Sequence, residues 1–196
     1  MKRAGILLAV ATIALCSCQK PPQEAINASR AAYEKAAGNP DTLTYAPDSL
    51  RAAQEKLDVL SAELDMQSKK GSLLRNYDGT TRLAQEAQSA SNKAVSDAIL
   101  AKEQARAEAE ALFTTLDESI PVFETKAWAA KRVRGIKLDQ DIPTLAQDAR
   151  TAIEDARTDF DAGSFAAAKA KALTIQERLK DGEARINEAT RLAKKR

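Results

Sequence analysis

Histidine is absent from this 196-residue chain. Its absence excludes a histidine general base, a serine–histidine triad and the side chain that most often binds metal ions in proteins. An enzyme with this sequence would have to work with carboxylates or lysines alone, and no such constellation is found. The sequence therefore predicts a non-enzymatic protein with no catalytic residues, no metal site and no cofactor.

Aromatic residues make up only 4% of the chain, whereas alanine accounts for 40 of its 196 residues. Such a composition favours slim, closely packed helices over a thick apolar core. The formal net charge is +2, and removal of Lys2 and Arg3 leaves 28 basic against 28 acidic residues. A neutral chain has no electrostatic basis for binding nucleic acid, so we expect none.

Residues 1–17 have the layout of a secretory signal peptide. Lys2 and Arg3 precede the apolar run Ala4–Leu15, and small residues follow it. This run is too short to span a bilayer, which takes about 20 apolar residues, and no longer run occurs elsewhere. We therefore expect the body of the protein to be held at a membrane by something other than a transmembrane helix.

The signal ends in Leu15-Cys16-Ser17-Cys18, which resembles the bacterial lipobox. In that motif a small residue precedes the cysteine that receives lipid and becomes the first residue of the mature protein. Cys18 fits this pattern better than Cys16, which follows a bulky leucine. The resemblance implies lipidation of Cys18, a short lipidated tether over residues 18–22, and attachment to the cell membrane through the N-terminal lipid.

An ordinary signal peptide with two incidental cysteines is the alternative. Cys16 and Cys18 are the only cysteines, and a disulfide between them would enclose one residue and stabilise nothing. Cleavage before Cys18 would also remove Cys16. The next residue is Gln19 rather than aspartate, which by resemblance to enterobacterial sorting rules implies the outer membrane, with the protein facing the periplasm.

Helical periodicity dominates the remaining chain, and no alternating β-branched stretch is long enough to predict a strand. We expect an all-α fold of elongated antiparallel helical hairpins that form a bundle with coiled-coil-like, alanine-rich packing. The predicted helices cover about residues 23–37, 47–70, 76–117, 122–134, 143–161 and 165–196. We expect breaks at Gly38-Asn39-Pro40, Gly71, Gly135 and Gly163, a break or kink at Pro121, and loops at Asp41–Ala46 and Ile136–Asp141.

Apolar stripes at spacings of three and four indicate which helix faces are buried. One stripe contains Leu50, Ala53, Leu57, Leu60 and Leu64; a second contains Phe165, Ala168, Ala172, Ile175, Leu179, Gly182, Ile186 and Ala189. The long helix has Tyr77, Ala84, Ala87, Ala94, Ala98, Ala101, Ala105, Leu112 and Leu116 on its inner face. Gly182 is the weak point of the last helix, because glycine destabilises a helix interior.

The stretch Ser49–Leu64 matches Leu145–Phe160 at an offset of 96 residues. Duplication of a helical hairpin explains the match, and so does the shared alanine-rich composition of two helices. We divide the chain into a first hairpin unit over residues 23–117 and a second over 118–196, which is predicted to be a degenerate repeat. Neither hairpin buries its stripe alone, so each needs the other or a partner.

The run Tyr45-Ala46-Pro47-Asp48-Ser49-Leu50, followed by Asn76-Tyr77 and Arg82–Ala87, resembles the bacterial domain of unknown function 4398 (DUF4398) family. That family consists of envelope lipoproteins, and the resemblance covers roughly Ala25–Ile99. The second half matches more loosely, with Pro143 kept before its helix and Phe165 in place of the tyrosine. The family has no established activity, so the resemblance implies a location and a helical fold.

A basic cluster surrounds the only tryptophan of the chain, Trp128. The cluster consists of Lys126, Lys131, Arg132, Arg134 and Lys137. It has the chemistry of an interaction patch for anionic lipid headgroups or a protein partner, with an aromatic anchor beside the charges. The alternative is a solvated helix face with Trp128 in the core.

Two classes of function remain. The first is a structural or protein-interaction role in the cell envelope, with an envelope protein as partner. The second is an accessory carrier or chaperone-like factor that holds a hydrophobic ligand or client, although alanine-lined interfaces leave little cavity volume. A peptidoglycan-associated tether is a further alternative, because the basic Arg191–Arg196 end resembles that of the major outer-membrane (Braun) lipoprotein, which ends in lysine.

Overall fold

The structure is a computed structural model that describes residues 20–133, 136 and 138–195. These residues form an all-α fold, as predicted, and none of them lies in a strand. The elements are α1 (Gln23–Ala37), α2 (Pro40–Tyr45), α3 (Pro47–Lys69), the 3₁₀ turn η1 (Ser72–Leu74), α4 (Asp78–Arg132), α5 (Ile142–Asp161) and α6 (Phe165–Lys194).

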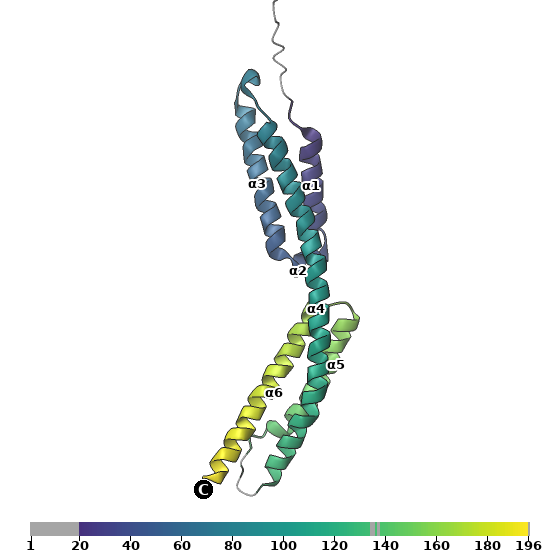
Figure 1. Cartoon of the computed structure of the whole chain (residues 1–196), viewed down its shortest axis with the longest axis vertical. Coiled ribbons are helices and arrows are strands. Elements are labelled where there is room, and N and C mark those ends of the chain that lie inside the picture. The colour runs from purple at the N-terminus through teal and green to yellow at the C-terminus, as the bar shows by residue number, and fades with distance from the viewer. Residues whose placement is uncertain (1–19, 134–135, 137, 196) are drawn as a thin grey trace, which may run out of the picture.

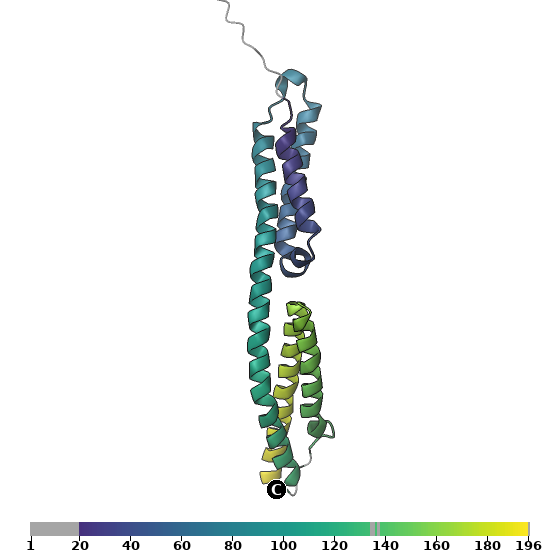
Figure 2. The same cartoon turned by 90° about the vertical axis from the view of Figure 1, so that its right-hand side faces the viewer.

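The molecule is an elongated rod built along α4 (Figure 1). Helices α1 and α3 pack along the first half of α4, and α5 and α6 pack along its second half, so that two three-helix bundles follow each other and share one helix (Figure 2). The start of α1 and the turn η1 lie at one end of the rod. The end of α6 lies at the other, together with the end of α4.

The long helix α4 runs through Pro121, so the predicted division into separate helices over residues 76–117 and 122–134 is wrong. Proline removes a backbone N–H from the helix and crowds the preceding turn. Pro121 is exposed, however, and its neighbours Ile120 and Phe123 are buried against α5 and α6. Burial of these side chains requires the helix to continue, and the predicted unit boundary between residues 117 and 118 therefore lies inside α4.

The segment predicted as the loop Asp41–Ala46 contains the short helix α2 instead. Asn39 caps this helix, because its side-chain Oδ1 accepts a hydrogen bond of 2.9 Å from the backbone N–H of Asp41. Pro40 occupies the first helical position, where its missing N–H has no cost. The Asp41 carboxylate then pairs with Lys102 of α4 at 2.9 Å, which fixes α2 against the middle of the rod.

Alanine dominates the first half of the buried α4 face, as predicted. Ala84, Ala87, Ala94 and Ala98 are fully buried there. In the second half of α4 the buried face also contains larger residues, namely Phe113, Leu116, Ile120 and Phe123. Leu112, which was predicted on this face, is only partly buried, since the helix phase drifts over a seven-residue pattern and turns Phe113 inward.

Gly163 makes the turn between α5 and α6, as predicted. Its φ of +77° lies in the left-handed region that favours glycine. Its N–H donates to the Phe160 carbonyl, and the N–H of Ser164 donates to the Asp159 carbonyl. The offset of 96 residues that aligns α3 with α5 also places α1 on residues 119–133, which covers the last stretch of α4 and the residue after it. Both bundles thus have the same order of three helices.

No helix in the described part of the chain combines the length and the apolar character that a membrane span requires.

Candidate functional site

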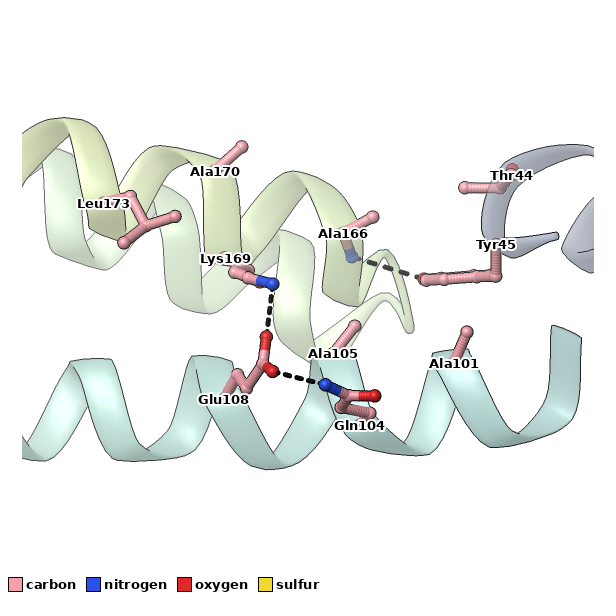
Figure 3. A pocket seen from close by; sticks show the side chains of 10 residues that line it. All are labelled: Thr44, Tyr45, Ala101, Gln104, Ala105, Glu108, Ala166, Lys169, Ala170 and Leu173. Carbon is pink, nitrogen blue, oxygen red and sulfur yellow. Dashed lines mark hydrogen bonds and ion pairs between the residues drawn. The ribbon is translucent and has the colours of Figure 1, made fainter. Parts of the chain in front are cut away.

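The two bundles meet at a waist where the end of α2, the middle of α4 and the first turn of α6 come together (Figure 3). The Tyr45 hydroxyl accepts a hydrogen bond of 3.3 Å from the backbone N–H of Ala166. The first N–H groups of a helix have no partner within the helix. Tyr45 therefore satisfies one of them and joins the first bundle directly to the second.

A cluster of charged and polar side chains on the next turns of α4 and α6 adds further contacts between the two helices. Lys169 forms an ion pair with Glu108, and the Gln104 side chain donates a hydrogen bond of 2.8 Å to the same carboxylate. The hydrogen bond from Lys169, and then that from Gln104, hold the pKa of Glu108 below its ordinary value. The carboxylate is thus kept ionised and is not suited to accept or deliver protons near neutral pH.

Small and apolar side chains line the remainder of the waist, which forms an open hollow of about 410 Å³. Half of its lining residues are apolar, namely Ala101, Ala105, Ala166, Ala170 and Leu173. The polar groups of this hollow are engaged with one another, Glu108 with Lys169 and Gln104, and Tyr45 with the N–H of Ala166. We therefore interpret the waist as a structural joint. Sequence reasoning did not find it, because no local signal connects Tyr45 with Ala166.

Three basic residues of the sequence-predicted patch are described near the C-terminal end of α4, and two of them, Lys131 and Arg132, lie beside Trp128. Trp128 is 58% exposed, so the alternative that placed it in the core is wrong. The Lys131 ammonium lies 5.9 Å from the centre of the indole ring, and the Arg132 guanidinium carbon lies 5.7 Å from it. At these distances both cations interact with the ring face.

Lys126 does not belong to this surface. A helix turns by about 100° per residue, so two positions separate Lys126 from Trp128 by about 200°. The Lys126 ammonium instead lies 2.8 Å from a carboxylate oxygen of Glu183 on α6. Arg134 and Lys137 fall outside the described residues, and so does the predicted lipidation site Cys18. We call Trp128, Lys131 and Arg132 the tryptophan surface.

Two shallow hollows flank the indole of Trp128. One of about 180 Å³ lies between α4 and α5 and includes Pro143 and Ala146. The other, of about 580 Å³, follows α4 and includes Pro121 and Thr125. Among the described residues neither Lys131 nor Arg132 forms an ion pair, in contrast to Glu124 beside them, which pairs with Arg150 at 2.6 Å. The tryptophan surface therefore offers a flat aromatic ring and two cations that no described carboxylate neutralises.

Within the described ranges, no group of three or more cysteine or acidic side chains lies close enough to hold a metal ion. Comparison of the whole chain with protein-family models, with curated proteins and with solved structures finds no match. The resemblance to DUF4398 lipoproteins thus rests on the sequence motifs alone.

Proposed function

We propose that this chain is a non-enzymatic lipoprotein of the bacterial cell envelope that carries a protein-interaction surface far from its membrane anchor. Lipid on Cys18 would hold one end of the rod at the membrane, and the tryptophan surface near the other end would bind an envelope protein. The observation that carries the proposal is the unbroken helix α4, whose 55 residues join the two ends.

The distance between the two ends follows from the helix geometry. From Asp78 at the start of α4 to Trp128, a rise of 1.5 Å per residue gives about 75 Å. Cys18 is only two residues before Lys20, the first described residue, so a lipid on Cys18 lies within about 7 Å of Lys20 along the chain. Two helices pack along each half of α4, first α1 with α3 and then α5 with α6. This packing makes the distance between the two ends of the rod rigid.

The chemistry of the tryptophan surface indicates the kind of partner. Tryptophan and arginine are the residues that contribute most often to the energy of protein interfaces. The cations Lys131 and Arg132 lack a described ion-pair partner and favour an acidic surface on the bound protein. We propose an acidic protein of the periplasm as the partner. Because Gln19 follows the lipidated cysteine, we propose the outer membrane as the membrane that holds the anchor. We also propose that the chain belongs to the DUF4398 family.

Metabolic labelling with a fatty-acid analogue tests the anchor. We expect label on the wild-type chain and on Cys16→Ala, because Cys16 is removed with the signal peptide. The Cys18→Ala chain should carry no label and should stay unprocessed or be released from the membrane. Label that persists on the Cys18→Ala chain would contradict the anchor assignment.

Photocrosslinking in intact cells tests whether the tryptophan surface binds a partner protein. A photoreactive amino acid in place of Trp128 should give a defined crosslinked band, whereas the same amino acid in place of Leu100, which is 70% exposed near the middle of α4, should not. Charge reversal by Lys131→Glu and Arg132→Glu should remove the band while leaving the helical content unchanged. Equal crosslinking from both positions, or a band that survives charge reversal, would count against the tryptophan surface as the binding site.

A further inference from the structure

The connection between α3 and α4 exposes the two least buried large hydrophobic side chains of the described chain. Leu73 is 76% exposed and Leu74 is 75% exposed, and both lie in the turn η1. Met66, at the end of α3, is exposed as well. Single exposed leucines are common on protein surfaces, but here adjacent leucines form the tip of a rod.

The backbone of this connection is held in place by the residues around it. Arg75 donates two hydrogen bonds of 3.1 Å, from Nε to the Lys70 carbonyl and from Nη2 to the Ser68 carbonyl. The buried side chain of Gln67 accepts a hydrogen bond of 3.1 Å from the backbone N–H of Asn76. The fold therefore presents the leucines outward in a defined loop rather than turning them onto the helices.

The charged residues within the connection itself are all basic, and the acidic residues next to it in the sequence, Asp65 and Asp78, lie in α3 and at the start of α4. From Met66 to Tyr77 the chain contains Lys69, Lys70 and Arg75 and no acidic residue. In the described part of the chain, neither lysine forms an ion pair. Apolar side chains flanked by basic residues are the combination that binds the interface of an anionic membrane.

The same end of the rod carries the start of the described chain. Figures 1 and 2 both place the beginning of α1 beside the end that holds η1. The proposed lipid on Cys18 is two residues from Lys20, so the membrane has to lie at this end, and this inference rests on the proposed lipid anchor. The position of the chain start and the basic flank together single out the bilayer as the surface that Leu73 and Leu74 face.

We propose that Leu73 and Leu74 insert into the headgroup region of the membrane that holds the lipid anchor, with Lys69 and Lys70 against anionic headgroups. A lipid on a short tether fixes one point and leaves the rod free to tilt. The loop adds a second attachment at the same end. The rod then stands on the membrane, and the tryptophan surface is held about 75 Å away from it, the distance given by the rise of α4.

Depth-dependent fluorescence quenching tests this proposal on the intact lipidated protein. The chain would be reconstituted into vesicles of phosphatidylethanolamine and phosphatidylglycerol that contain a lipid brominated on its acyl chain. Trp128 is the only native tryptophan, so Leu74→Trp combined with Trp128→Phe places a single indole in the loop. Matched controls are Leu100→Trp with Trp128→Phe, and the wild-type chain, whose indoles lie in the middle and near the far end of the rod.

We expect the indole at position 74 to lose intensity to the brominated lipid and to emit at a shorter wavelength than in solution, whereas both controls keep their intensity. Lys69→Glu with Lys70→Glu in the loop-indole chain should reduce the quenching. Equal quenching at positions 74 and 128 would overturn the proposal, and so would a blue shift at position 74 without quenching, which would mean that a second copy of the chain covers the leucines.

Mass spectrometry of the same preparation separates the two proposals. If the mature chain carries lipid on Cys18 and the indole at position 74 is not quenched, the loop proposal fails and the lipoprotein proposal stands. If no lipid is attached to the chain, the lipoprotein proposal fails and the loop proposal falls with it. The replaced leucine is largely exposed, so the substitution leaves the packing of the bundle intact.

Discussion

Replacement of Gly182 by alanine should destabilise the protein, although alanine is the better helix former. A Cβ atom at this position of α6 would lie 2.7 Å from Leu145 Cδ2 and 2.8 Å from Phe123 Cε2. These distances are far inside van der Waals contact, and Phe123, which is 1% exposed, would have to shift within the core. The glycine that is a weak point for the helix thus allows α4, α5 and α6 to pack closely.

The size of the expected change in the free energy of unfolding follows from two opposing contributions. Alanine in a helix interior is favoured over glycine by about 1 kcal/mol. Insertion of a methyl group into a filled core costs about 1–3 kcal/mol. We therefore expect Gly182→Ala to lower the free energy of unfolding by about 0–2 kcal/mol, the difference between these two effects.

Gly79→Ala is the matched control, because the nearest atom to its Cβ would be a Glu63 carboxylate oxygen at 4.0 Å. This variant gains helix propensity without a clash and should be stabilised by up to about 1 kcal/mol. Urea denaturation followed by circular dichroism measures both free energies. The argument is refuted if Gly182→Ala stabilises the protein as much as Gly79→Ala does. Phe123→Leu should also cost less stability in the Gly182→Ala background than alone, since it relieves the clash.

Two further predictions concern α4. Pro121→Ala should raise the free energy of unfolding by about 1–3 kcal/mol, because it restores a helix N–H at an exposed position; an unchanged midpoint in thermal denaturation would contradict this. Lys169 and Gln104 lower the pKa of Glu108 in the folded state, so the stabilisation by this carboxylate is present above its unfolded pKa of about 4.5 and is lost as the pH falls through the lower folded value. Glu108→Gln should therefore lose less stability than the wild type between about pH 5 and pH 3, as measured by urea denaturation; identical losses would refute the role of this carboxylate.

Much of the fold is predictable because the signals are local. Pro47 and Pro143 lie at the starts of α3 and α5, and Gly163 supplies the left-handed turn before α6. Most of the positions on the predicted apolar stripes at spacings of three and four are buried. The continuity of α4 was not predictable in this way. Pro121 is a local helix breaker, and its effect is overridden by the burial of Ile120 and Phe123 against α5 and α6, which are distant in the sequence.

The candidate site, too, was predictable from the sequence only in part. The sequence placed five basic residues near Trp128, and helix phase decides which of them share its surface. Lys131 and Arg132 lie three and four positions after Trp128 and reach its ring, whereas Lys126 points to Glu183. The exposure of Trp128 depends on which face of α4 the other helices cover, and the sequence alone left that open.

By itself the sequence determined that the chain is helical, which faces of the helices are apolar and where most of the helices begin and end, because these properties depend on spacing and on capping within a few residues. Only the tertiary structure decided that one helix serves both bundles, that Tyr45 meets Ala166 across 121 positions, and that the start of α1 and the leucine loop share one end of the rod. Those features depend on contacts between distant segments, whose free energy outweighs the local preference of a single residue such as Pro121.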